Sequence, residues 1–368
     1  MEKYRLPALY VLVAMLLLAN CVREIEFQQN DADQESLVVS GVFTDGNGPH
    51  IVRLSRPGNY NRQVFPAVSG ASVRLSDDLG NVYQYQEINP PDLAPYYQLS
   101  QVQGKTGRSY TLEIDLPNGE QYRSHPQIMP EPFPLDSVEV HGQWYYANAA
   151  TGVVVREPFA FAYARTKAPQ QPKDHYLHWD SEATYLFNEL SPKPYNFFDP
   201  YASQQCFVNN RVNDQLVAIA DLSKYDPGGV VYENVGKRKI DQAFEKKIAF
   251  SVYQRSIGRE AYAYWNKINK LLTASGTIFD TPPAAVAGNL ENLTHSDRPA
   301  LGFFEVGAAD TVRVYTGNGQ LGHDFLLQSV PYCQLDYTAG FPPVNHPECD
   351  DCLSGIKGAT TQAPWWWQ

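Results

Sequence analysis

Four cysteines in the later part of the chain are the residues best suited to chemistry by type and spacing. They are Cys206, Cys333, Cys349 and Cys352, and the last two form a Cys-x-x-Cys segment with His346 just before it. Structural zinc takes four Cys or His ligands in a tetrahedral array, which this count allows. A redox dithiol is disfavoured because no helical pattern follows the Cys-x-x-Cys to activate a thiol. The choice between zinc and disulfides depends on the compartment in which the chain folds.

The start of the chain indicates that compartment. Lys3 and Arg5 precede an apolar run over residues 8–19, which is shorter than the roughly 20 residues that a membrane-spanning helix needs. A charged start and a short apolar run are typical of a secretion signal. The run ends in Leu-Ala-Asn-Cys at Cys21, which resembles the lipobox of bacterial lipoproteins. That resemblance implies removal of residues 1–20 and lipidation of Cys21. The other interpretation is an ordinary signal peptide with a chance cysteine.

Residues 21–36 form an acidic segment behind that cysteine. An acidic cluster in this place resembles the surface-export signal of Bacteroidota lipoproteins, and the alternative is a solvated acidic tether. Two or more acyl chains anchor a protein stably, and the resemblance implies three on Cys21. We therefore expect a lipid anchor in the outer membrane, with the protein facing the cell exterior.

Outside the cytoplasm, an even number of remaining cysteines favours two disulfides over a zinc site. Four cysteines allow three pairings. Of these we expect Cys349–Cys352 as a local bond and Cys206–Cys333 across the core. We expect no metal and no cofactor.

Other combinations of polar residues point less clearly to chemistry. His175 and His178 would pair as metal ligands on a helix, but on the strand expected here residues three apart face opposite sides. The sequence contains no nucleophile elbow, zinc-protease motif or phosphate-binding loop. A hydrolase would need two carboxylates about 5–9.5 Å apart in one cleft. We therefore expect no enzymatic activity.

Two further kinds of surface site are indicated. Ser137 and Thr311 each follow an Asp and precede a Val, which resembles the short O-glycosylation pattern of Bacteroidota proteins. Trp365, Trp366 and Trp367 are adjacent and cannot all face one core. We expect at least one of them to contact a partner, a glycan or the lipid interface, and the alternative is a tail folded back over the sandwich.

Composition limits the partners. The chain has 29 basic and 40 acidic residues, for a formal net charge of −11. Nucleic acid is disfavoured as a ligand because its phosphates demand a basic surface. The 24 tyrosines suit both β-strands and binding surfaces.

The strands that must position these residues fall into two groups. Alternating segments with a turn about every ten residues predict an N-terminal β-sandwich over residues 37–129. Its predicted strands are 37–43, 50–55, 70–76, 82–85, 96–99 and 109–116. The prolines of residues 126–134 predict a stiff linker after it.

A larger β-sandwich domain is predicted over residues 130–332, followed by a cysteine- and tryptophan-containing tail over 333–368. Its predicted strands are 135–140, 159–163, 176–179, 248–253, 301–306 and 311–315, and residues 181–215 are expected to form a long loop. One amphipathic helix is predicted over 257–274, with Ser256 as its N-cap. Its apolar stripe is Ala261, Trp265, Ile268 and Leu272.

Two resemblances add to this interpretation. Residues 68–73, 78–81 and 107–112 are similar to the transthyretin-like, carboxypeptidase-regulatory sandwich of secreted bacterial proteins, which implies an interaction or spacer module. Four later segments look like the signature of domain-of-unknown-function family 4249, lipoproteins of Bacteroidota. They are Glu260–Trp265, Gly276–Pro283, Gly288–Asn292 and Leu301–Phe304. Members of that family are commonly encoded beside TonB-dependent receptors, and the resemblance supplies no catalytic residues.

These observations lead to one preferred hypothesis and two alternatives. We expect a lipid-anchored, mainly β accessory or scaffold protein of a TonB-dependent transporter or another outer-membrane machine, with an outer-membrane β-barrel protein as partner. The first alternative is a surface glycan- or peptide-binding lipoprotein that delivers its ligand to a transporter. The second is a hydrolase built from scattered Asp and Glu residues.

Overall fold

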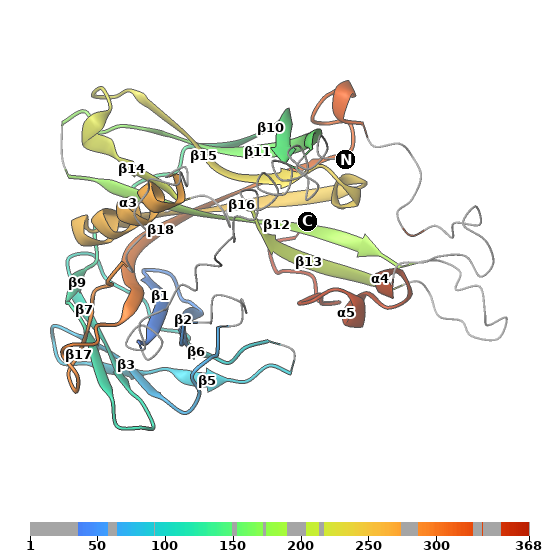
Figure 1. Cartoon of the computed structure of the whole chain (residues 1–368). Coiled ribbons are helices and arrows are strands. Elements are labelled where there is room, and N and C mark those ends of the chain that lie inside the picture. Colours follow the sequence, from blue (N-terminus) through green and yellow to red (C-terminus); the bar gives the residue numbers. More distant parts are fainter. Residues whose placement is uncertain are drawn as a thin grey trace, which may run out of the picture.

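The computed structural model describes most of the chain beyond the leader (Figure 1). The described residues are 36–57, 65–91, 93–148, 153–171, 174–189, 204–212, 217–273, 286–326, 333 and 347–367. Cys21, the leader and nearly all of the acidic segment lie outside these ranges. The protein is mainly β, as the alternating patterns predict. No helix among the described residues is long and apolar enough to cross a membrane.

A nine-stranded sheet runs through the whole molecule. Its order is β13 (Gln205–Arg211), β12 (Tyr176–Asn188), β16 (Lys247–Ile257), β18 (Leu301–Gly317), β1 (Val38–Thr44), β2 (His50–Ser55), β6 (Tyr96–Leu99) and β5 (Gln86–Ile88), and β14 (Ala218–Asp221) also pairs with β12. The β1–β18 pair is parallel, with Val38 opposite Leu301. The first and the last long strands of the chain are therefore neighbours.

One end of this sheet forms the first sandwich. The opposing sheet has the order β17 (Leu290–Asn292), β8 (Gln121–Ser124), β7 (Ser109–Asp115), β3 (Ser72–Asp77) and β4 (Val82–Gln84), and β9 (Gln127–Ile128) also pairs with β7. Val39, Phe43, Leu112 and Ile114 alternate into the core between the two sheets. Leu290 and Phe304 lie in the same core. Residues 290–304, which lie within the predicted second domain, therefore help to complete the core of the first sandwich.

The other end of the large sheet forms the second sandwich. A three-stranded sheet of β10 (Ser137–Asn148), β11 (Val154–Lys167) and β15 (Val230–Lys239) covers it, at the top of the view in Figure 1. Ala160, Ala162 and Ala164 of β11 face Trp179 and Phe250 of the large sheet in one core. The small side chains on β11 bring the two sheets close together.

The helix α3 (Arg259–Thr273) confirms the predicted element but not its cap. Ser256 is buried within β16, and Gly258 separates that strand from the helix. Only the first part of the expected apolar stripe is covered. Ala261 is buried and packs beside Trp265, whereas Leu272 is 57% exposed. Residue Gly276, the expected stop, lies outside the described residues.

Short helical segments complete the described elements. They are η1 (Leu222–Lys224), η2 (Gln242–Phe244), η3 (His323–Phe325), α4 (Pro347–Asp350) and α5 (Cys352–Gly355). The last two belong to the C-terminal tail, which lies beside β13 (Figure 1).

The prediction of a long loop over 181–215 is wrong for much of that range. Strand β12 continues to Asn188 and β13 follows at Gln205–Arg211. Most residues of β12 are buried on both faces of the sheet, which removes the alternation that identifies a half-exposed strand. The predicted strands 301–306 and 311–315 are likewise one continuous strand, β18.

Candidate functional site

One face of the large sheet gathers polar and aromatic side chains, and we call it the groove face. Because neighbouring side chains on a strand point to opposite sides, it is made by the even-numbered residues of β12 and the odd-numbered residues of β16 and β18. The strand register places His178 opposite Arg255, and Tyr253 opposite Thr311. The other face packs into the second core. The groove face carries α3 at one end and the C-terminal tail at the other.

A buried hydrogen-bonded network lies under α3 on this face. Glu305 accepts from His178 Nδ1 at 2.8 Å, from the Arg255 Nε–H group, and from Trp265 Nε1 at 2.7 Å. Arg255 also donates from Nη2 to Asp180 at 2.6 Å. Asp180 then accepts from the exposed Arg211 at 2.9 Å. Buried charges persist in proteins when they are paired in this way.

The charges of the network determine its protonation. Burial by itself would raise the pKa of the Glu305 carboxyl, but the charges of His178 and Arg255 outweigh it and lower this pKa to about 2. Burial opposes ionisation of Asp180 too, and Arg255 again dominates and holds the pKa of Asp180 well below its usual range. For Arg255, burial is outweighed by Glu305 and Asp180, which raise its pKa. Both carboxylates are therefore ionised and occupied at neutral pH.

A groove of about 860 Å³ opens beside this network. Its floor includes Asp180, Glu182 and Tyr253, and one wall comes from the turn between β1 and β2. Arg53 of β2 also lines the groove and has no ion-pairing carboxylate among the described residues. Burial, and then the like charge of Arg211, lower the pKa of Arg53. The groove therefore holds two arginines close enough to repel each other.

The C-terminal tail folds onto the far end of the groove face. The backbone oxygen of Trp366 accepts from the Tyr315 hydroxyl at 3.2 Å, and Trp367 packs edge-on to Phe207. Trp365 remains 91% exposed. Trp366 and Trp367 contact the sheet, as the folded-back alternative describes. Trp365 is exposed, and its contact with a partner, a glycan or the lipid interface stays a prediction.

The four later cysteines form two disulfides, but the expected pairing is wrong. The bonds are Cys206–Cys352 and Cys333–Cys349. Cys349 lies in α4 and Cys352 begins α5, and Asp351 between them caps α5 by accepting from the N–H groups of its first turn. This break in the chain direction sends the two cysteines to different partners.

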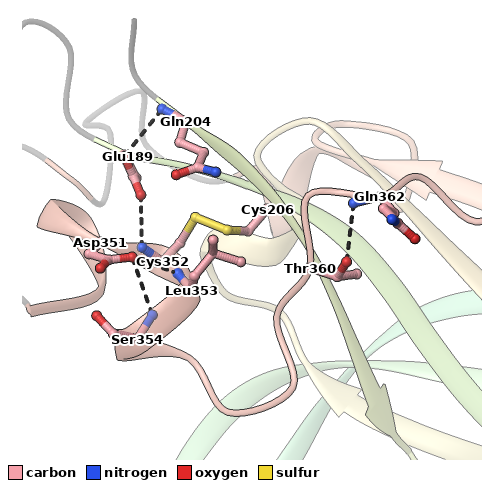
Figure 2. Close-up of a disulfide and its surroundings, with 9 residues drawn as sticks. All are labelled: Glu189, Gln204, Cys206, Asp351, Cys352, Leu353, Ser354, Thr360 and Gln362. Atoms are coloured by element: carbon pink, nitrogen blue, oxygen red, sulfur yellow. Dashed lines mark hydrogen bonds between the residues drawn. A yellow bond between two sulfur atoms is a disulfide. The ribbon is translucent and has the colours of Figure 1, made fainter. Parts of the chain in front are cut away.

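Figure 2 shows how the Cys206–Cys352 bond fastens the tail. Glu189 accepts from the N–H of Cys352 at 2.8 Å and from the N–H of Gln204 at 3.2 Å. Phe207 and Thr360 exchange backbone hydrogen bonds one residue along β13. The tail that carries the tryptophans is thus bound covalently to the edge of the large sheet.

The remaining candidate residues lie in different places. Ser137 begins β10, and Thr311 lies mid-strand in β18, where it lines the groove. His178 is buried against Glu305, while the ring of His175 packs on Phe133. Across the described ranges, no group of three Cys, His, Asp or Glu side chains is arranged to hold a metal ion.

A second surface is the outward face of the three-stranded sheet. It carries five aromatic residues that we call the outer aromatic face: Tyr145, Phe159, Phe161, Tyr163 and Tyr232. Phe161 is buried beneath its neighbours on this face. The Tyr163 and Tyr232 rings stack with centroids 4.8 Å apart, and the Lys237 ammonium lies 4.3 Å from the Tyr145 ring centroid. Tyr145 is 38% and Tyr232 is 43% exposed. Aromatic residues are enriched in protein interfaces.

Comparison with known proteins agrees with the resemblance found in the sequence. A model of the family described as "Domain of unknown function (DUF4249)" matches residues 22–313. The chain belongs to this family. No curated protein matches it. A solved pullulanase from Anoxybacillus sp. LM18-11, in complex with maltotriose, aligns at 10% identity with a TM-score of 0.16. The alignment covers 59% of this chain but 24% of that enzyme, and a likeness this small carries no argument.

Two of the segments that resemble the family signature make close contacts at the start of β18. The Asn289 amide donates to the Phe304 carbonyl and accepts from the Phe304 N–H, both at 2.9 Å. Gly302 has φ +84°, and a Cβ there would lie 2.0 Å from the Val39 carbonyl oxygen. A Cβ on Gly288 would in turn meet the Gly302 carbonyl oxygen at 1.8 Å. These residues hold the start of β18 against β1.

The helical part of the signature joins α3 to both sandwiches. Glu260 accepts from Gln127 Nε2 at 2.6 Å and lies 2.6 Å from His125 Nδ1, so it contacts the first sandwich. Trp265 reaches Glu305 of the large sheet. Residues 260–265 therefore help to hold the two sandwiches together.

Several residues of the groove face were missed from sequence alone. Arg53, Arg211, Arg255 and Arg313 belong to four different strands, and each alone looks like a solvated charge. Their alternation places each on a definite side of its strand. Only the register between strands, which the sequence does not show, brings them to one face.

Proposed function

We propose that the protein is a lipid-anchored outer-membrane accessory or scaffold protein that docks onto an outer-membrane β-barrel protein, a TonB-dependent transporter foremost. The observation that carries the docking is the outer aromatic face. It is a cluster of aromatic rings in which Tyr145 and Tyr232 are exposed, and aromatic side chains are enriched in protein interfaces. The apolar leader and Cys21 support attachment to the membrane on which such a partner resides.

The charges around this face suit a protein partner. Lys237 stacks on Tyr145 and Phe159, and Arg165 lies 3.6 Å from Glu139 at the end nearest Tyr232. Tyrosines flanked by cations combine large contact area with polar ends, which is the composition of binding hot spots. An acidic surface of the partner would complement the cations in a chain whose net charge is −11.

Crosslinking in intact cells tests the docking. The wild-type chain should crosslink to one outer-membrane β-barrel protein, identified by mass spectrometry. The double variant Tyr145→Ser, Tyr232→Ser should lose that product because two exposed rings leave the interface. Trp365→Ser removes an exposed ring from another surface and should retain it. Equal crosslinking of the two variants would contradict docking through this face.

Lipidation has its own test. Cys21→Ala should move the protein from the membrane fraction to the soluble fraction, since the acyl chains supply the attachment. Mass spectrometry of the mature N-terminal peptide should show an acylated cysteine in the wild type. An unmodified Cys21 would contradict the anchor.

A second candidate function is capture of a small surface ligand, as in the glycan- or peptide-binding alternative. The observation in its favour is the groove face, where a groove of about 860 Å³ and a smaller pocket at the tail lie on one side of the sheet.

A further inference from the structure

A pocket of about 470 Å³ lies where the C-terminal tail meets the groove face. It is lined by Arg313, Tyr315, Trp365 and Trp366. Its size falls within the range of small-molecule sites. The disulfide at Cys352 and the Tyr315–Trp366 hydrogen bond hold its tail side in place.

Arg313 is the charged group of this pocket, and its bonding is incomplete. The guanidinium carbon lies 4.7 Å from the Trp366 ring centroid and 5.8 Å from the Trp365 centroid. Its Nε atom is buried without a hydrogen-bond partner. No carboxylate in the described part of the chain forms an ion pair with Arg313. An arginine that lines a pocket without a carboxylate partner can form hydrogen bonds to a group that the protein itself does not supply.

The geometry of the guanidinium selects the shape of that group. Stacking on an indole occupies the flat faces of the arginine and leaves its in-plane N–H groups free. Those N–H groups form a fork that matches a carboxylate. Within a chain of net charge −11, an arginine kept unpaired beside a pocket favours an anionic ligand.

The exposed ring of Trp365 places a second condition on the ligand. Its ring is 91% exposed, although its neighbour Trp366 packs against the sheet. A flat apolar surface beside a cation suits a ligand with one apolar ring face and polar edges. A saccharide ring has such a face, and a sugar acid adds the carboxylate.

We propose that the Trp365–Arg313 pocket binds an acidic saccharide, with a sugar ring stacked on Trp365 and its carboxylate held by Arg313. This inference rests on the second candidate function, ligand capture, and is independent of docking through the outer aromatic face. The Tyr315 hydroxyl is already engaged with the tail, so Arg313 is the main polar contact.

Calorimetric titration of the detergent-solubilised full-length protein tests the proposal. The probes are a trigalacturonate, its methyl ester, and a short acidic peptide of the same charge. The ester keeps every ring and removes the charge. Trigalacturonate should bind, and the ester should bind about tenfold more weakly or worse because the charge-assisted hydrogen bonds are lost. Equal binding of the ester, no binding of trigalacturonate, or tighter binding of the peptide would overturn the proposal.

Variants assign the binding to the pocket. Trp365→Ala and Arg313→Gln should each lower the affinity for trigalacturonate by about tenfold or more. Trp365 is so exposed that its removal leaves the fold intact, which circular dichroism would check for both variants. Trp144→Ala removes a partly exposed indole of the three-stranded sheet and should bind as the wild type. Undiminished binding by Trp365→Ala would overturn the site. The Tyr145→Ser, Tyr232→Ser variant should bind trigalacturonate as the wild type does. If it also loses the crosslink, saccharide binding and partner docking use different surfaces.

Discussion

Arg255 is the residue through which the two carboxylates of the buried network are neutralised. It contacts Glu305 on one side and Asp180 on the other, and it is itself buried. Glu305 is also satisfied by Trp265, so the network connects α3 to the floor of the groove. These groups give the groove face a fixed shape, and Arg53 lines the groove with no carboxylate partner among the described residues.

Replacing Arg255 should therefore destabilise the protein strongly. Arg255→Met leaves two ionised carboxylates in a buried site, which costs about 3–5 kcal/mol of unfolding free energy. Urea denaturation followed by tryptophan fluorescence measures it. Arg211→Gln is the matched control, because its exposed pair with Asp180 contributes about 0–1 kcal/mol. Similar losses in the two variants would contradict the burial argument.

The network also predicts how stability depends on pH. The pKa of Glu305 falls from 4.5 to about 2 on folding. Between these values the unfolded chain binds more protons, so stability decreases as the pH falls from about 4.5 towards 2. Urea midpoints measured from pH 6 to pH 3 should show this decrease in the wild type. Glu305→Gln should show a shallower one, and parallel curves would count against Glu305 as the titrating group.

Among the elements, β18 has the most demanding position. It pairs with β1 in parallel over its first part and with β16 in antiparallel over the rest. Gly302 allows this close approach because no side chain separates its backbone from the Val39 carbonyl. In this chain the position therefore requires glycine for steric reasons.

Gly302→Ala should weaken the contact between β1 and β18. Gly80 is the control, because it also has a positive φ (+83°) but has open space where a Cβ would lie. Gly80→Ala incurs only the left-handed backbone penalty of about 1–2 kcal/mol. Gly302→Ala adds the clash with Val39, about 1–3 kcal/mol more. Thermal unfolding of both variants compares them, and equal melting temperatures would contradict this account of Gly302.

The elements also show how far the sequence alone leads. Half-exposed strands such as β1, β2 and β7 alternate clearly and were predicted within a residue or two. The predicted strand over residues 176–179 is shorter than β12, because both faces of β12 are covered and its pattern does not alternate. The groove could not be predicted, since it depends on parallel pairing between Val38 and Leu301. Nor could the disulfide pairing, which is decided by the turn at Asp351.

At the scale of the whole molecule, two sandwiches share one sheet and one helix. The large sheet supplies a layer to each core, and α3 contacts both through Glu260 and Trp265. The groove between them is therefore walled by both sandwiches and does not depend on a flexible hinge. Such a body can present the outer aromatic face and the tail pocket in fixed relation.

The two disulfides should stabilise this body unequally. Cys206–Cys352 closes a loop with a sequence separation of 146, and Cys333–Cys349 closes one of 16. The chain-entropy model gives about 5 kcal/mol for the first and about 3 kcal/mol for the second. Chemical denaturation of the two double Cys→Ser variants should show the larger loss for the Cys206–Cys352 pair. A larger loss for the Cys333–Cys349 pair would contradict this ranking.

The parallel pairing of β1 with β18 sets the order in which the protein can be completed. The first sandwich is synthesised early, yet the strand that closes its sheet is made near the end of the chain. Until then β1 has an open edge, the kind of surface that recruits unrelated strands. A polypeptide halted before residue 301 would keep that edge, so partial products should aggregate and full-length chains should not. Both sandwiches are therefore complete only when the whole of β18 has been made and has joined the sheet.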